Sequence, residues 1–473
     1  MRGATFKPLI AAALGSLMVA GCLPFTHSTY ERPKLPTENT WDQAPAQDAA
    51  ASPVAIQTTT LAPSNDHPTR WVREFHDADL SALVQQVLTV NADLAAAGIR
   101  LRQARMSARL ATSQLFPTFT GSLSSSASRP LDHRADWADS SGAALGASWE
   151  LDLFGRLSAV RNAAHWEAAA TERDLAATRL ALIGTTVNGW WQLAYANERI
   201  AIGEQSLAYA RQALELVQLQ YRAGAVSRLG LRDAEQNVAA QEASQAQLVQ
   251  GRVEARNALA ALLEQQAYRG PERTELPRDT LPEVDAGLPS SILARRPDLA
   301  AAELRLRKSL ATADAMRASF YPALTLTGSV GTASTALANF VSNPSASLGA
   351  LLSLPFLNVD RVRLSSGIAR ADYEIAVREF TQSFYDALRD TANALSARVQ
   401  LAQRGKALER TYAAARDAEQ LYERQYRAGA IPLRSWLDAQ ERRRSAENSL
   451  IENRLDRLNA QVALHQALGD ETL

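Results

Sequence analysis

The sequence predicts a mainly α-helical protein that also carries membrane β-strands and is internally duplicated. Three observations predict this fold class. Sequence blocks return at a constant spacing, long tracts without proline are rich in helix-forming residues, and four segments alternate apolar and polar side chains. The expected fold is therefore two copies of one series of elements, each copy with two strands and a long helical hairpin.

The duplication is visible as matching blocks. Residues 221–225, Tyr-Arg-Ala-Gly-Ala, return as residues 426–430, and the spacing is 205 (426 − 221 = 205). Residues 93–97, Asp-Leu-Ala-Ala-Ala, return at the same spacing as residues 298–302. The register continues without net insertion, which indicates that each half is built from the same elements.

Composition limits the classes of function. The chain has 473 residues, 46% of them hydrophobic, with 50 basic and 50 acidic side chains and one cysteine. This is enough for a large core, and length alone allows two or three domains. The balanced charge argues against nucleic acid as a partner, because nucleic-acid binding normally leaves a basic patch. A single cysteine excludes an internal disulfide and a thiolate metal cluster.

The N-terminus has the pattern of an export signal. Arg2 and Lys7 precede a short apolar stretch, which predicts a signal peptide over residues 1–21. Residues 19–22, Val-Ala-Gly-Cys, resemble the bacterial lipobox, in which the cysteine is acylated and becomes the first mature residue. We therefore expect a lipid anchor, including palmitate, on Cys22. The alternative is an ordinary export signal with a cysteine nearby by chance.

Proline usage predicts the domain boundaries. Residues 22–68 are rich in Pro, Thr and Ser and predict a lipid-anchored extended segment. Residues 69–270 form the first predicted repeat, the proline-rich residues 271–297 a linker, and residues 298–473 the second repeat. Outside the signal region, no stretch has the ~18 consecutive apolar residues of a transmembrane helix.

Each repeat is expected to contain a helix, two strands and a long helical hairpin. The hairpins are predicted over about 156–265 and 361–468, because proline is nearly absent there and Gly224 and Gly429 follow the first helix of each. The first hairpin also carries a seven-residue apolar repeat typical of a coiled coil, at Leu193, Ile200, Leu207, Leu214 and Tyr221. An amphipathic helix in an ordinary bundle is the alternative, which the length of the tract disfavours.

The four alternating segments predict strands at about 117–128, 143–153, 322–332 and 346–356. Their length suits tilted strands that cross a bilayer with one apolar and one polar face. A soluble β-hairpin is the alternative. Unpaired strand edges cannot face lipid and membrane barrels need at least eight strands, so spanning strands must be shared between chains. Two copies would supply eight strands and three would supply twelve.

The motifs resemble those of the TolC-like outer-membrane efflux channels, in particular their lipidated OprM-like branch. The resemblance rests on Trp-Glu-Leu-Asp-Leu-Phe-Gly-Arg at 149–156, Arg-Arg-Pro-Asp-Leu at 295–299, Tyr-Arg-Ala-Gly in both copies, and Leu-Asp-Ala-Gln at 437–440. It implies a homotrimer in the outer membrane, with a shared twelve-stranded β-barrel and an α-barrel that continues as a periplasmic tunnel. It also implies a proton-driven inner-membrane pump and a periplasmic adaptor as partners.

The resemblance further suggests residues at the hairpin tips. Asp233 and Asp438 lie twelve residues after the repeated tyrosines and are the candidates for an acidic channel gate; the acidic partner usual in the family is replaced by Ser435. Solvated helix-surface charges are the alternative reading. The candidates for the tip turn or for adaptor docking are Tyr221, Arg222, Gly224, Tyr426, Arg427 and Gly429.

No constellation predicts an enzyme, a cofactor or a metal site. The six histidines are scattered, and in His-Asp-Ala-Asp at 76–79 we expect Asp77 or Asp79 to cap a helix over Leu80–Val90. The leading interpretation is a passive exit duct for small molecules such as drugs or toxic compounds. The alternatives are a lipid-anchored structural coiled-coil protein of the envelope and an outer-membrane duct for type I secretion.

Overall fold

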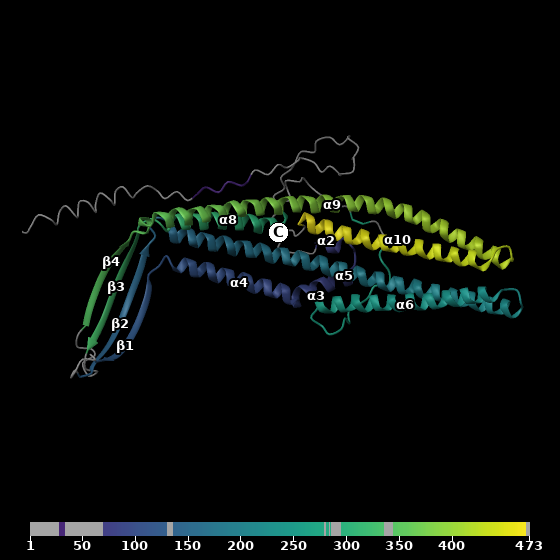
Figure 1. Ribbon diagram of the computed structural model, residues 1–473, viewed down its shortest axis with the longest axis horizontal. Coiled ribbons are helices and arrows are strands. Elements are labelled where there is room, and N and C mark those ends of the chain that lie inside the picture. The colour runs from purple at the N-terminus through teal and green to yellow at the C-terminus, as the bar shows by residue number, and fades with distance from the viewer. Residues whose placement is uncertain are drawn as a thin grey trace, which may run out of the picture. The chain divides into compact units, whose positions relative to one another are not determined.

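The computed structural model describes residues 28–33, 70–129, 136–278, 281–282, 284, 295–334 and 344–469 (Figure 1). The predicted signal peptide, Cys22 and most of the predicted 22–68 segment lie outside these residues. The described chain is mostly helical and carries one four-stranded sheet, so the predicted fold class is confirmed.

The elements occur twice in the same order. The first series consists of α2 (Arg70–Arg73), α3 (Ala78–Val90), α4 (Ala92–Ser113), β1 (Thr118–Ser128), β2 (Ala138–Leu151), α5 (Arg156–Arg222) and α6 (Arg228–Leu262). The second consists of α8 (Pro297–Ala318), β3 (Ala323–Ser334), β4 (Pro344–Ser353), the 3₁₀ turn η3 (Pro355–Leu357), α9 (Val359–Arg427) and α10 (Leu433–Leu468). Helices α4 and α8 start 205 residues apart (297 − 92 = 205) and have 22 residues each.

The four strands form one antiparallel sheet in the order β1-β2-β3-β4. The central pair, β2 with β3, joins the two sequence copies: Trp149 lies opposite Leu326 and Leu145 opposite Val330. The sheet therefore needs both halves of the chain, as Figure 1 also shows.

The strand bounds lie within two residues of the sequence prediction except at two ends. Strand β2 begins at Ala138 rather than near 143, because its backbone pairs with β1 as far as Ser128 opposite Ala138, and this pairing requires no apolar alternation. Strand β4 ends at Ser353 rather than near 356, and Pro355 begins η3 instead. Proline has no amide hydrogen for the strand ladder and is a natural stop there.

The long helices are continuous. Helix α5 has 67 residues and α9 has 69, consistent with tracts that lack proline and are rich in good helix formers. On α5 the predicted seven-residue repeat is buried within the chain at Leu193 and Ile200, half-buried at Leu207 and Leu214, and exposed at Tyr221. Contacts within a single chain therefore account for the buried part of the predicted coiled-coil seam.

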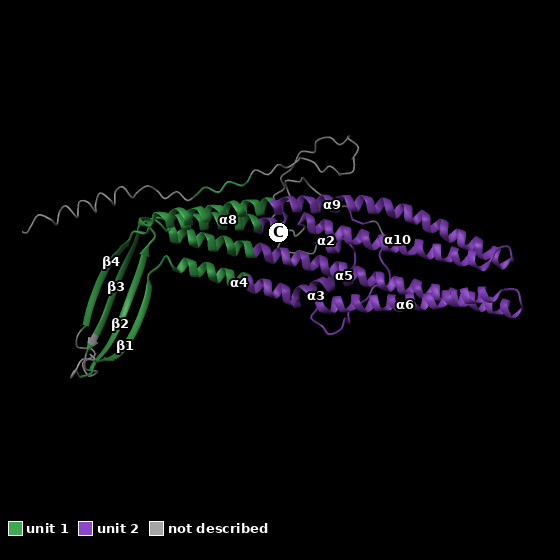
Figure 2. Ribbon diagram, viewed as in Figure 1, with its two compact units in different colours: residues 1–34, 101–171, 302–381 green, residues 35–100, 172–301, 382–473 purple. Residues whose placement is uncertain are grey.

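Contacts divide the chain into two units (Figure 2). One unit contains residues 1–34, 101–171 and 302–381, and includes the sheet. The other contains residues 35–100, 172–301 and 382–473, and includes both hairpin tips. Each unit takes residues from both sequence copies.

The largest core cluster lies in the second of these units. Its fully buried centre is Trp190 and Trp191 of α5, packed with side chains of α3, α6 and α10. Asp77 caps α3: its carboxylate accepts the Leu80 amide at 3.0 Å and also receives Trp190 Nε1 and Arg273 Nη1. The capping role predicted at this position is confirmed for Asp77, and the helix begins at Ala78.

Candidate functional site

The sheet exposes an entire apolar face. Directly opposed residues of antiparallel strands point to the same side, so the register assigns one face to the large side chains. These exposed residues are Phe119, Leu123, Leu145, Trp149, Leu326, Val330, Leu348 and Leu352. Leu348 is 94% exposed in the middle of β4. An apolar patch of this kind marks a surface that is covered by something other than water.

The opposite face is made of small polar residues. It carries Thr118, Thr120, Ser122 and Ser124 on β1 and Thr325, Thr327 and Ser329 on β3. Ser329 Oγ lies 2.7 Å from Ser347 Oγ of β4. Leu351, opposite Thr325, is the large apolar residue that the register places on this face. In the described part of the chain, β1 and β4 each pair along one side only, so both outer edges of the sheet are open.

The turn from β2 into α5 is held by the motif at 149–156. Arg156 Nη2 donates to both carboxylate oxygens of Glu150 at 2.8 Å, and Asp152 accepts the amides of Leu157 and Ser158 at 2.9 and 2.8 Å. Gly155 has a φ of 74°, which favours glycine. Glu150 and Asp152 therefore fix the direction in which the long helix leaves the sheet.

Both hairpin tips use the same helix stop. After α5, the Ala225 amide donates to the Gln220 carbonyl and the Gly224 amide to the Tyr221 carbonyl, the bond pattern of a Schellman motif. The second copy repeats it through Gly429 and Ala430. Both glycines have a φ of 74°. The repeated Tyr-Arg-Ala-Gly thus has a conformational reason in each copy.

The two repeated tyrosines have different surroundings. The hydroxyl of Tyr426 donates to Gln220 Oε1 at 2.6 Å, and its ring stacks on Trp436 with centroids 5.2 Å apart. Tyr426 is buried, whereas Tyr221 is 40% exposed. The structure therefore joins the two tips through Tyr426 and not through Tyr221. The sequence analysis missed Gln220 and Trp436, and no signal in the repeat marks them.

Each of the two repeated arginines bonds to a residue of its own helix. Arg222 Nε donates to the Gln218 carbonyl at 3.3 Å, and Arg427 Nη2 pairs with Glu423 at 2.6 Å. Both side chains remain accessible at the tips.

The two aspartates proposed for the gate lie on the return helices. Asp438 is exposed on α10 and Asp233 is half-buried on α6. Among the described residues, neither carboxylate has an ion-pair partner. Ser435, one turn before Asp438, is half-buried.

A half-buried ionic network lies between α9 and α10, near the second tip. Arg443 lies 2.7 Å from both Glu419 and Glu447, and Tyr412 donates to Glu447 at 3.0 Å. Burial raises the pKa of Glu419, although Arg443 acts against the rise. This network was not predicted, because its members are ordinary helix residues in the sequence.

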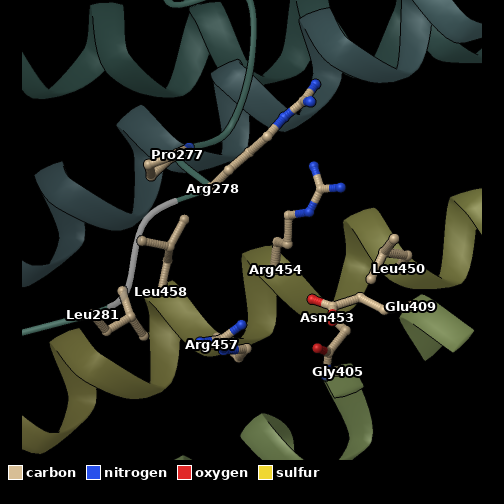
Figure 3. Close-up of a pocket in the computed structure, with 10 residues that line it drawn as sticks. All are labelled: Pro277, Arg278, Leu281, Gly405, Glu409, Leu450, Asn453, Arg454, Arg457 and Leu458. Carbon is tan, nitrogen blue, oxygen red and sulfur yellow. The ribbon is translucent and has the colours of Figure 1, made fainter. Parts of the chain in front are cut away.

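The segment between the repeats packs on the second hairpin. A pocket of about 170 Å³ lies between Pro277, Arg278 and Leu281 of this segment and side chains of α9 and α10. Figure 3 shows the side chains that line it. Arg454 at its wall donates to Glu198, whose other oxygen accepts the Leu276 amide at 2.9 Å. These bonds fix the position of the linker and present no reactive group.

Nothing in the described ranges forms a cluster of three metal-ligating side chains. Where the structure can be read, no single helix has both the length and the apolar character to cross a membrane; the bent pair α3 and α4 passes on length and composition alone.

A family model described as "Outer membrane efflux protein" matches residues 83–265 and 288–470. The two matches are spaced like the internal repeat (288 − 83 = 205). The pyoverdine export outer membrane protein OpmQ of Pseudomonas aeruginosa is 32% identical over 414 residues, 85% of this chain and 87% of OpmQ. Outer membrane protein OprJ of the same species is 31% identical and covers 98% of this chain and 94% of its own length.

The structure is also similar to the solved outer-membrane channel OprN. The TM-score is 0.79 at 28% identity, and the match covers 94% of this chain and 99% of OprN. The similarity includes both the sheet and the long helices, because nearly the whole chain is aligned.

Proposed function

The chain belongs to the outer membrane efflux protein family, and we propose that it is a channel lipoprotein, the passive exit duct through which an efflux system passes small molecules outward. It provides a conduit and performs no catalysis. Transport is driven by partner proteins.

The observation that carries this proposal is the sheet with one apolar face and two open edges. Unpaired backbone groups at these edges would be costly in lipid, and closed membrane barrels have eight or more strands. One chain supplies four strands. A homotrimer supplies twelve, with β1 of each copy paired to β4 of the next. The polar faces with Thr and Ser then line a water-filled lumen.

The long hairpins extend the duct into the periplasm. Helix α5 alone, at 67 residues, reaches about 100 Å at 1.5 Å per residue. In this proposal the tips meet a periplasmic adaptor and align the duct with a proton-driven inner-membrane pump. The exposed Arg222 and Arg427 at the tips are candidate adaptor contacts.

The outer membrane holds the chain in two ways. The strands span the bilayer, and Cys22, which lies outside the described residues, carries the lipid anchor. Two independent attachments make release from the membrane rare, because a single acyl chain binds only weakly.

Small molecules are the proposed cargo. The relative OpmQ is named for the export of pyoverdine, which supports a small exported compound over a polypeptide. The drugs or toxic compounds expected from the sequence fit the same class.

The test uses purified outer membranes and a deletion strain. We expect trimers that require detergent and dissociate on heating, ion conductance in planar bilayers, and restored resistance to drugs or dyes when the gene is returned. A chain that becomes a water-soluble monomer once its lipid is removed, without conductance, would instead support the structural coiled-coil protein.

A further inference from the structure

A short N-terminal segment binds one face of α8. Residues 28–33, here called the strap, are described next to this helix, although residues 34–69 lie outside the described ranges. The Ser28 amide and hydroxyl donate to the two carboxylate oxygens of Asp314 at 2.9 and 2.6 Å. The Tyr30 hydroxyl and the Arg32 guanidinium both bind the carboxylate of Glu303.

The face that binds the strap is built for it. Asp314 is 3% exposed and Glu303 is 8% exposed, so both carboxylates are almost completely withdrawn from water. Buried carboxylates require partners, and the strap supplies several of them. Arg307, one turn after Glu303, donates to it at 2.9 Å and lies between the rings of Tyr30 and Trp166, at 4.6 and 5.3 Å from their centroids.

The repeat supplies an internal comparison, because α4 is the counterpart of α8. Position 303 corresponds to Gly98 and position 314 to Arg109 (314 − 205 = 109), while Trp166 of α5 corresponds to Ala371. Helix α4 therefore lacks both carboxylates, and α9, the counterpart of α5, lacks the aromatic ring. The strap site is a local departure from an otherwise matching architecture, which points to a purpose specific to this place.

The strap also has a direction. Its first residue meets Asp314 and its fifth meets Glu303, so it runs antiparallel to α8. The spans agree: eleven helical residues cover about 16 Å and four extended residues about 13 Å. The N-terminal end of the strap thus lies toward the end of α8 that leads into β3, which begins nine residues after Asp314 (323 − 314 = 9).

We propose that the Glu303–Asp314 face of α8 is a docking site for the strap, and that docking positions the lipid anchor beside the sheet. Cys22 is six residues before Ser28, so it lies within about 20 Å of that residue in any conformation. The anchor is then held where the strands enter the membrane, and it holds this end of each copy against the bilayer while the sheet is inserted. This role rests on the proposed lipidation of Cys22 and on the proposed membrane sheet.

The first test measures docking alone, in the full-length lipidated protein. Hydrogen exchange should show protection of the Ser28 amide, and the double variant Glu303→Gln/Asp314→Asn should exchange at least about tenfold faster, because charge-assisted bonds are lost. Arg109→Asn, at the repeat counterpart of Asp314, is the control and should leave the protection unchanged. Equal exchange in wild type and double variant would overturn the docking site.

The second test measures the consequence for the anchor. The same six-residue Gly-Ser insert is placed before the strap, after Thr26, or behind it, after Pro36. The insert before the strap and the double variant should each lower the amount of heat-dissociable assembly in the outer membrane several-fold, with palmitate labelling retained. The insert behind the strap should have no effect.

Two results would overturn the positioning role: equal effects of the two inserts, or no palmitate on the wild-type chain. A deletion strain that gains no resistance from the wild-type gene would count against the efflux function instead. The docking measurement would stand in that case, since it needs no transport.

Discussion

The hydroxyl of Tyr426 lies 2.6 Å from the side-chain oxygen of Gln220 and joins the tip of the second hairpin to the tip of the first. Its counterpart Tyr221 is exposed. The bond stabilises one arrangement of the two tips, and separation of the tips must break it. The stacking of Tyr426 on Trp436 lies within the second hairpin and fixes the position of the tyrosine ring.

Tyr426→Phe removes this bond and keeps the ring. A neutral hydrogen bond contributes about 1 kcal/mol, so the population of open tips should rise about fivefold. Single-channel recordings in planar bilayers should show longer or more frequent open events. Tyr221→Phe is the matched control and should behave like wild type; equal effects of both changes would refute the link.

Asp438→Ala tests the proposed acidic gate. If three copies of this carboxylate face one another across the closed mouth, its removal should raise conductance and weaken cation preference, because an acidic ring attracts cations. Reversal potentials in a salt gradient measure the preference. Asp233→Ala, in the first sequence repeat of each chain, shows whether both aspartates contribute to the cation preference. Unchanged conductance and selectivity in Asp438→Ala would show that Asp438 is a solvated charge on the helix surface and not part of a gate.

Leu348→Arg tests which face of the sheet meets lipid. A cation on the lipid face of a membrane barrel costs about 2–4 kcal/mol at the bilayer midplane. We expect a several-fold loss of assembled protein from outer-membrane fractions. Ser347→Arg, one residue earlier on the opposite face, should assemble normally and change ion selectivity. The reverse ranking would show that the faces are assigned wrongly.

Arg156→Ala tests the turn from β2 into α5. The pair with Glu150 is bidentate but partly exposed, so its loss should destabilise by about 1 kcal/mol. The detergent-solubilised protein should lose helical circular dichroism at a lower temperature. Arg361, the repeat counterpart, has no ion-pair partner among the residues with described positions, and Arg361→Ala should have little effect. Equal shifts would mean that the Glu150 pair is unimportant.

The strap should detach in acid. Burial alone would raise the pKa of Glu303, but the guanidinium groups of Arg32 and Arg307 outweigh it and lower the pKa overall; Tyr30 also faces this carboxylate. A carboxylate with a lowered pKa in the folded state stabilises above the unfolded pKa of about 4.3, and this contribution is lost as the pH falls through the folded value. Protection of residues 28–33 should therefore persist at neutral pH and fall below about pH 4. Glu303→Gln should have less protection at neutral pH and a weaker response to acid.

Much of the fold could be predicted from the sequence because it depends on local patterns. The absence of proline predicts α5 from Arg156 to Arg222, and the alternation of side chains predicts the strands. Strand ends also depend on pairing: β2 begins earlier than its apolar alternation, because backbone pairing with β1 continues without it.

The differences between the two copies could not be predicted. Tyr221 and Tyr426 have the same sequence neighbours, and only packing against Trp436 and Gln220 makes the second one buried. The binding of the strap to α8 could not be predicted either, since its partners Glu303 and Asp314 are more than 270 residues away in the sequence. Whether Asp233 and Asp438 line an aperture depends on contacts between copies and stays a prediction.

The exposed apolar side of the sheet has a consequence for biogenesis. On the way from the inner to the outer membrane, eight large hydrophobic residues on four strands would be open to self-association. Strand pairing must then be delayed until the chain reaches its destination, or the surface must be shielded in transit by a carrier. The need for delay or shielding does not apply to the helices, which can form before the chain reaches the outer membrane.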